Sequence, residues 1–269
     1  MSKEQTFERK EIKYLLSDQQ YRLLLPELTK YAKVDSYGKT RINNIYYDTP
    51  SFQLIRTSLD KPVYKEKLRL RTYGDTEDST QAFIEIKKKY KGIVYKRRVA
   101  STYRSAVEYL SGERTLGADE VSQVTGEIDE LLEYYRGIRP AMVIGYDRIA
   151  MAGTIDPDFR VTFDTNITWR TSDLDLKHGS DGDKVIETGQ HLMEIKIPDA
   201  FPMELSRRMS ELGIFPVSIS KYGRGYIEYI KQAANSLIEM SQSEAAPLLV
   251  PEYIKGNKGN RRKGEMVYA

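Results

Sequence analysis

The sequence of 269 residues contains no cysteine and only two histidines, His178 and His191. Without cysteine the chain has neither a disulfide framework nor a thiolate metal site, which is consistent with a reducing compartment. The two histidines lie in or near an expected loop and lack the spacing of metal ligands. We therefore expect no metal site built from thiolate and imidazole.

Long apolar runs are also absent from the sequence. No stretch approaches the roughly 18 consecutive apolar residues that a membrane span needs, and residues 1–13 are charged and lack the apolar core of a signal peptide. We therefore predict a cytoplasmic protein that does not insert into a membrane. The net charge of +3 is too small to predict nucleic-acid binding, and no nucleic-acid partner is expected.

The amino-acid composition is typical of a folded protein with many half-buried strands. Apolar residues make up 40% of the sequence, and it has 20 tyrosines but only 7 phenylalanines. We expect one domain over residues 1–240 and a basic, disordered tail over 241–269. Alternation and turn signals predict strands over 7–16, 41–47, 63–73, 81–89, 93–101, 141–151, 159–169 and 184–197. Helical periodicity predicts helices over 19–32, 52–59, 103–110, 119–135, 202–212 and 222–240.

Charged side chains alternate with aliphatic ones in five of the expected strands. Residues two apart on a strand share a face, so each of these strands has one charged and one aliphatic face. The charged faces hold, in chain order, Arg9, Glu11 and Lys13; Lys65, Lys67, Arg69 and Arg71; Glu85, Lys87 and Lys89; Lys96 and Arg98; and Glu194 and Lys196.

Two interpretations of this alternation are open. For a single strand, the pattern is that of an ordinary antiparallel sheet with one face in water. Five such strands together favour a barrel whose aliphatic faces are covered by helices and whose charged faces line a lumen. A lumen crowded with Arg and Lys requires an anion, and the interspersed Glu11, Glu85 and Glu194 are oxygen ligands suited to Mg²⁺ or Mn²⁺.

Six motifs over residues 7–230 together resemble the VTC domain. They are Arg-x-Glu-x-Lys-Tyr at 9–14, Leu-Arg-Leu-Arg-Thr-Tyr-Gly at 68–74, Ile-Glu-Ile-Lys-Lys-Lys at 84–89, Gly-Tyr-Asp-Arg at 145–148, Met-Glu-Ile-Lys at 193–196 and Ser-Lys-Tyr at 220–222. The VTC domain is the polyphosphate polymerase module of the vacuolar transporter chaperone complex and belongs to the triphosphate tunnel metalloenzymes. The resemblance implies an α+β fold, a closed antiparallel eight-stranded β-barrel with helices packed outside.

The resemblance also implies roles for individual residues. Arg69, Arg71, Lys87, Lys96, Arg148, Arg160 and Lys221 would be catalytic tunnel cations, and Arg9, Lys13, Lys67, Lys89, Arg98 and Lys196 would bind substrate. Glu194, with Glu11 as helper, would hold Mn²⁺ or Mg²⁺. An alternative remains for two of the cations, because Arg148 could simply pair with Asp147, and Arg160 with Asp164.

The function implied by the resemblance is transfer of the γ-phosphate of ATP to a growing polyphosphate chain. A triphosphatase and a non-catalytic binder of polyphosphate or another polyanion are the alternatives. Arg9 stands where many tunnel triphosphatases carry the first glutamate of Glu-x-Glu-x-Lys, which argues against a hydrolase, and Ser218 stands where a basic residue is expected. The expected ligands are ATP and inorganic polyphosphate or triphosphate, and the chain would work alone or with a separate membrane protein.

Overall fold

The structure, a computed structural model, describes residues 10–156, 158–197 and 201–244. The chain divides into two compact units, residues 1–230 and 231–269, and the sheet and cavities described below belong to the first. Arg9 lies outside the described residues. So does the predicted tail, except for residues 241–244, which end helix α6 (Lys221–Glu244).

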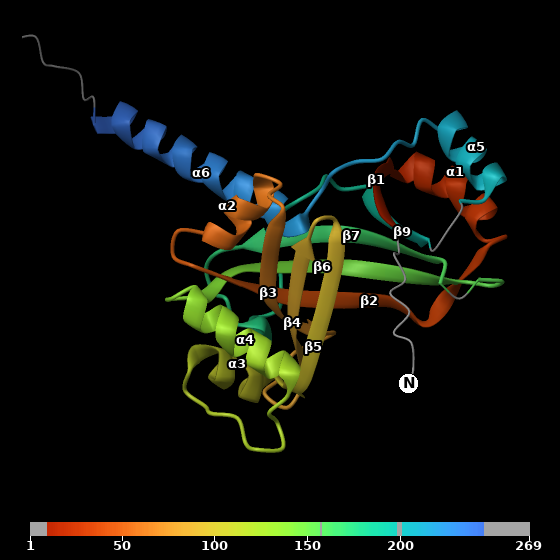
Figure 1. The fold of residues 1–269 in the computed structure, drawn as a ribbon. Coiled ribbons are helices and arrows are strands. Elements are labelled where there is room, and N and C mark those ends of the chain that lie inside the picture. Colours follow the sequence, from red (N-terminus) through yellow and green to blue (C-terminus); the bar gives the residue numbers. More distant parts are fainter. Residues whose placement is uncertain (1–9, 157, 198–200, 245–269) are drawn as a thin grey trace, which may run out of the picture. The chain divides into compact units, whose positions relative to one another are not determined.

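One antiparallel sheet of nine strands forms the first unit (Figure 1). Its strands are β1 (Lys10–Ser17), β2 (Ala32–Asp48), β3 (Tyr64–Tyr73), β4 (Gln81–Tyr90), β5 (Ile93–Thr102), β6 (Arg139–Gly153), β7 (Arg160–Arg170), β8 (Asp183–Lys184) and β9 (Gln190–Ile197). Their order is β1-β9-β7-β6-β2-β3-β4-β5, and β8 pairs only with β7.

The prediction of an α+β fold with antiparallel strands is confirmed, but its finer detail differs from the structure. Among the described residues no backbone ladder joins the end strands β1 and β5, so the sheet is not closed by hydrogen bonds. Instead, β1 and β4 approach each other through side chains, since Lys87 Nζ lies 4.0 Å from Glu11 Oε2. The other edge of β1 is taken up at this point by the segment before α6, since the Val217 N–H donates to the Lys13 carbonyl at 2.7 Å.

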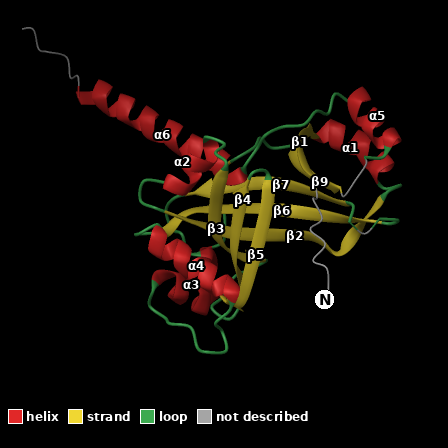
Figure 2. Cartoon of the chain, in the orientation of Figure 1, coloured by secondary structure: helices red, strands yellow, loops and turns green. Residues whose placement is uncertain are grey.

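Helices cover the sheet in three groups (Figure 2). Helices α1 (Asp18–Leu28) and α5 (Met203–Glu211) pack on β1, β7 and β9, and α3 (Tyr103–Ser111) and α4 (Gln123–Tyr134) pack on the aliphatic face of β3 and β4. Helix α2 (Gln53–Leu59) and the first turns of α6 pack on the opposite face of β2 and β6, the face that carries the charges. Among the described helices, none has the length and apolarity needed to cross a membrane.

The alternation within the strands explains this division. On β2, Ile45 and Tyr47 belong to the core under α3 and α4, whereas Tyr46 between them belongs to the core under α6. The aliphatic face of β3 and β4 is fully buried, with Leu68 and Leu70 at 0% exposure. The charged faces of these strands therefore turn away from α3 and α4, as the sequence predicted.

Two predicted strands have different bounds in the structure. The strand expected over 184–197 is divided into β8 and β9 by a turn, in which Gly189 has φ +81 and the Glu187 N–H donates to the Gln190 side chain. The strand expected over 41–47 extends back to Ala32. Its first part is polar and mostly exposed, so it lacks the alternation that identifies a strand.

Candidate functional site

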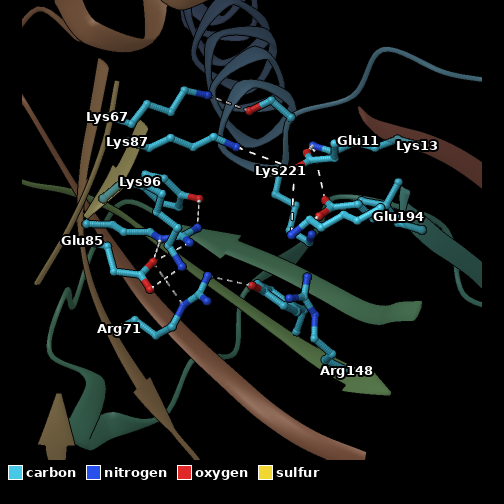
Figure 3. Close-up of a pocket in the computed structure, with 16 residues that line it drawn as sticks. Glu11, Lys13, Lys67, Arg71, Glu85, Lys87, Lys96, Arg148, Glu194 and Lys221 are labelled. Carbon is cyan, nitrogen blue, oxygen red and sulfur yellow. Dashed lines mark hydrogen bonds and ion pairs between the residues drawn. The ribbon is translucent and has the colours of Figure 1, made fainter. Parts of the chain in front are cut away.

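A cavity of about 180 Å³ lies on the charged face of the sheet, and we name it the inner cavity. Nine cationic side chains and three carboxylates line it, and the labelled ones point toward one another (Figure 3). Its residues are Glu11, Lys13, Tyr46, Lys67, Arg69, Arg71, Glu85, Lys87, Lys96, Tyr146, Arg148, Leu192, Glu194, Lys196, Ser220 and Lys221.

Lys13 lies between two carboxylates on neighbouring strands. Its Nζ is 3.3 Å from Glu11 Oε1 and 3.6 Å from Glu194 Oε2, because Lys13 and Glu194 are directly opposed in the register of β1 and β9. Lys196 Nζ lies 3.1 Å from the other oxygen of Glu194. Burial by itself would raise the pKa of Glu194, but Lys196 and Lys13 outweigh it and lower the pKa to about 2. Glu194 is therefore ionised near neutral pH.

Glu85 forms a second cluster on β3, β4 and β5. Arg69 Nε donates to its Oε2 at 2.7 Å, Lys96 Nζ lies 2.9 Å from its Oε1, and Arg71 Nε lies 3.9 Å from its Oε2. Glu85 is 2% exposed, and although burial raises its pKa, the three cations lower it to about 2. The carboxylate holds the two arginines in fixed positions along β3.

Asp164 forms the third cluster and is completely buried. Arg148 donates to both of its oxygens, at 2.6 and 2.7 Å, and Lys221 at the start of α6 also pairs with it. The alternative pairing of Arg148 with Asp147 is therefore wrong, since Asp147 pairs with Lys39 and Arg41. The pairing of Arg160 with Asp164 is likewise not found, because Arg148 and Lys221 occupy that carboxylate.

Tyrosine hydroxyls complete the wall of the cavity behind the arginines. Arg69 donates to Tyr46 at 3.1 Å, and Arg71 donates to Tyr146 at 3.1 Å. Burial raises the pKa of each tyrosine, but the arginines outweigh it and lower both pKa values. Tyr46 also stacks on Tyr222 with ring centroids 4.4 Å apart, which fixes the first turn of α6 against the sheet.

That first turn positions two further residues of the cavity. The Ser220 Oγ accepts the Gly223 N–H at 3.2 Å, as an N-capping residue does, and it also accepts a hydrogen bond from Lys67 at 3.0 Å. Tyr222 donates to Asp48 at 2.8 Å, and Lys221 beside it reaches into the cavity. Burial and the neighbouring Lys65, Lys87, Lys13 and Arg69 lower the pKa of Lys67 to about 7.

The structure brings together eleven of the fifteen predicted site residues in the inner cavity. Lys89 lines a second, adjoining cavity. Arg98 is exposed and lies 4.6 Å from the centroid of the Phe83 ring, and Arg160 is exposed at the start of β7 opposite Lys196. Neither of these two arginines lines the inner cavity, and Arg9 lies outside the described residues.

The sequence predicted no site role for Tyr46, Tyr146, Ser220 or Asp164, and it indicated Glu85 only as an oxygen ligand suited to a divalent ion. Glu85 was visible in the alternation of β4, and Tyr146 stands inside the Gly-Tyr-Asp-Arg motif. For Tyr46 and Asp164, the sequence indicates only a position on a strand. Their place in the site follows from how the strands pair, which the sequence of one strand does not give. Pairing across strands is a non-local property that spacing along one strand does not contain.

Glu11 and Glu194 are the two carboxylates expected to hold a divalent metal ion. The described part of the chain holds no group of three or more acidic, histidine or cysteine side chains arranged for a metal. Mg²⁺ is commonly held by one or two carboxylates together with substrate phosphates, and Mn²⁺ also accepts oxygen ligands. Both carboxylates lie within 4 Å of Lys13 Nζ and so face the same space, which fits an ion that binds together with phosphate.

The antiparallel sheet with a cation-lined cavity on one face agrees with the antiparallel fold and the basic cavity that the resemblance to the VTC domain implied. The model of the VTC domain matches residues 8–229, most of the chain, and the chain belongs to the VTC domain family. No curated protein matches the chain.

Several solved structures are similar to this chain at low sequence identity. A candidate adenylate cyclase from Bacillus halodurans has a TM-score of 0.48 at 14% identity, covering 79% of this chain and 95% of its own. A second from Vibrio parahaemolyticus has a TM-score of 0.44 at 13% identity, covering 80% and 96%. HpAC1 from Hippeastrum, described as having a dominant triphosphatase activity, has a TM-score of 0.40 at 14% identity, covering 81% and 95%.

Proposed function

We propose that the chain is a polyphosphate polymerase that transfers the γ-phosphate of ATP to a growing polyphosphate chain in the inner cavity. The observation that carries this proposal is the convergence of nine cationic side chains on one cavity lined by only three carboxylates. Such an excess of positive charge repels itself unless an anion lies among it. A chain of phosphates offers several negative charges to such a group of cations.

Each type of cation has its own part in this proposal. Arg69, Arg71 and Arg148 are held by Glu85 and Asp164, so their guanidinium groups are fixed for directed contacts with phosphate oxygens. Lysines act as mobile point charges and stabilise phosphate without fixing its orientation. Phosphoryl transfer depends mainly on positioning and charge neutralisation. The proposal therefore needs no general base from the protein.

Glu194 and Glu11 would hold Mn²⁺ or Mg²⁺ in this proposal. When bound, the ion would neutralise phosphate oxygens and polarise the transferring group. Lys13 contributes separately, because it keeps both carboxylates oriented toward the cavity. In the proposed tunnel, the eight strands other than β8 form the wall, and the side chains of Lys87 and Glu11 span the gap between β1 and β4.

Incubation with ATP and Mn²⁺ tests the proposal when long phosphate chains and orthophosphate are measured in the same sample. The expected product is acid-insoluble polyphosphate. Orthophosphate alone would instead identify a triphosphatase, and binding without either product would identify a non-catalytic binder. Arg71→Lys keeps the charge but loses the directed contacts, and we expect its rate to fall by about a hundredfold. Arg136→Lys, at an exposed position outside the cavity, is the matched control.

A further inference from the structure

A second cavity adjoins the inner one and has a different chemical character. This outer cavity has a volume of about 630 Å³ and shares Glu11, Lys13, Lys67, Lys87 and Ser220 with the inner cavity. These five shared residues place the two spaces next to each other. The outer cavity adds three lysines, one glutamate (Glu66) and no arginine, and we name Lys61, Lys65, Lys67 and Lys89 the lysine vestibule.

The lysine vestibule lacks the carboxylate partners of the inner cavity. Among the described residues, every inner-cavity cation except Lys67 has a carboxylate oxygen within 4.0 Å. No carboxylate of the described chain forms an ion pair with any of the four vestibule lysines. Lys65 donates instead to the Ser58 carbonyl at 3.1 Å, and Lys67 donates to Ser220. The four vestibule lysines therefore have no ion-pair partner in the described chain, although Glu11 and Glu66 also line the outer cavity and leave it with a net positive charge.

The strand register places these like charges directly opposite each other. Lys65 pairs with Lys89, and Lys67 with Lys87, across β3 and β4. Directly opposed like charges destabilise a sheet. Burial, followed by the nearby Lys89, Lys61 and Lys87, lowers the pKa of Lys65, so the strain is electrostatic. An anion lying between the two strands removes this repulsion.

Apolar side chains also line the outer cavity, with Ile12, Leu59, Val94, Val217 and Ile219 among them. Six lysines and two glutamates line the outer cavity, and a cleft with such a net positive charge attracts an entering anion. Lysine ammonium groups bind phosphate as mobile point charges and do not impose the bidentate geometry of arginine. This chemistry suits repeated phosphates that pass through the vestibule without a fixed register.

We propose that the lysine vestibule holds the distal phosphates of a linear polyphosphate whose end lies in the inner cavity, and so favours long chains over triphosphate. This holding site rests on the proposed function of the inner cavity. In this proposal, Lys61 and Lys65 bind substrate. The inner cavity fixes the reacting phosphates, and the lysine vestibule retains the rest of the polyphosphate.

The test compares binding of inorganic triphosphate with binding of a long linear polyphosphate, both measured by calorimetry without metal. In Lys65→Gln/Lys89→Gln we expect the affinity for the long chain to fall by about tenfold or more and that for triphosphate to change less than about twofold. Lys33→Gln, at an exposed position on β2, should change neither. Equal losses for both ligands, or no loss for the long chain, would overturn the holding site.

Two further measurements make the test specific. Removing opposed like charges should leave the double variant at least as stable as the parent in thermal unfolding, so lost binding would not reflect misfolding. Lys61→Gln, on the connection before β3, should weaken long-chain binding alone and serves as a second variant. Tighter binding of an oligodeoxynucleotide of similar charge, with the same sensitivity to these variants, would overturn polyphosphate as the ligand.

Failure of this inference differs from failure of the proposed function. If the protein makes polyphosphate, but the Lys65→Gln/Lys89→Gln variant binds long polyphosphate as well as the parent does, the holding site is absent and the proposed activity stands. If the protein makes no polyphosphate, but the double variant loses affinity for long polyphosphate and not for triphosphate, the holding site is present and the polymerase activity is absent.

Discussion

Lys13 and Glu194 are directly opposed on β1 and β9, and Lys13 Nζ lies 3.6 Å from Glu194 Oε2. Lys13 was predicted to bind substrate and Glu194 to bind a metal ion, and this pair places the two side chains in direct contact. The lysine orients the carboxylate, and the carboxylate with Glu11 raises the pKa of the lysine against the effect of burial. Both side chains are therefore charged near neutral pH, as a site for phosphate and a divalent ion requires.

Glu194→Gln should separate the metal-binding role from phosphate binding. We expect turnover to fall by about a hundredfold and half-maximal activity to need more Mn²⁺, because one oxygen ligand loses its charge. Triphosphate binding in the presence of a chelator should stay the same or become tighter, since the cavity gains one positive charge. Rates at varied Mn²⁺, together with calorimetry in chelator, check both expectations. Glu187→Gln in the turn before β9 is the control, and unchanged turnover in Glu194→Gln would refute the assignment.

Glu85 predicts how stability changes in acid. Its pKa of about 2 in the folded protein lies below the value of about 4.3 for a free glutamate, so its ionised form stabilises the fold. That contribution is complete above the unfolded pKa and disappears as the pH falls through the folded pKa. The free energy of unfolding should therefore decline between about pH 5 and 2, by up to about 3 kcal/mol from this group.

Urea unfolding at a series of pH values checks this expectation. In Glu85→Gln the acid decline should be shallower, and stability at pH 7 should fall because Arg69 and Arg71 lose a buried partner. Glu133→Gln, at an exposed position on α4, should reproduce the parent profile. An equally steep acid decline in Glu85→Gln would show that other carboxylates account for it.

Gly145 of the Gly-Tyr-Asp-Arg motif has a structural role that explains its size. A Cβ at this position would lie 2.2 Å from Ser180 Oγ and 2.6 Å from the Ser180 carbonyl oxygen, because the loop before β8 crosses β6 there. Gly145→Ala should therefore lower the free energy of unfolding by about 2 kcal/mol. Gly126→Ala is the contrasting variant, since α4 leaves open space at Gly126 and alanine favours a helix by about 0.5–1 kcal/mol. Equal effects of the two substitutions on urea midpoints would contradict this reasoning.

The parts of the fold that the sequence predicts are those encoded locally. Alternation on β3 and β4 identified the charged face that carries Arg69, Arg71 and Lys87, and the structure places all three in the inner cavity. Asp164 could not be assigned, because its partners Arg148 and Lys221 come from another strand and a helix. The exposure of Arg160 could not be predicted either, since position along a shared face decides whether a side chain reaches the cavity or the solvent.

Lys67 predicts that binding of a phosphate chain takes up a proton. Its pKa of about 7 results from burial and from Lys65, Lys87, Lys13 and Arg69 around it, while Ser220, its hydrogen-bond partner, carries no charge. A bound phosphate raises this pKa, so affinity should decrease as the pH rises from about 7 to 9. Calorimetry in buffers of different ionisation enthalpy should detect the uptake at about pH 8. Lys67→Arg keeps a permanent charge and should abolish it, and Lys33→Arg should not. Proton uptake that persists in Lys67→Arg would assign the titration to another group in the cavity.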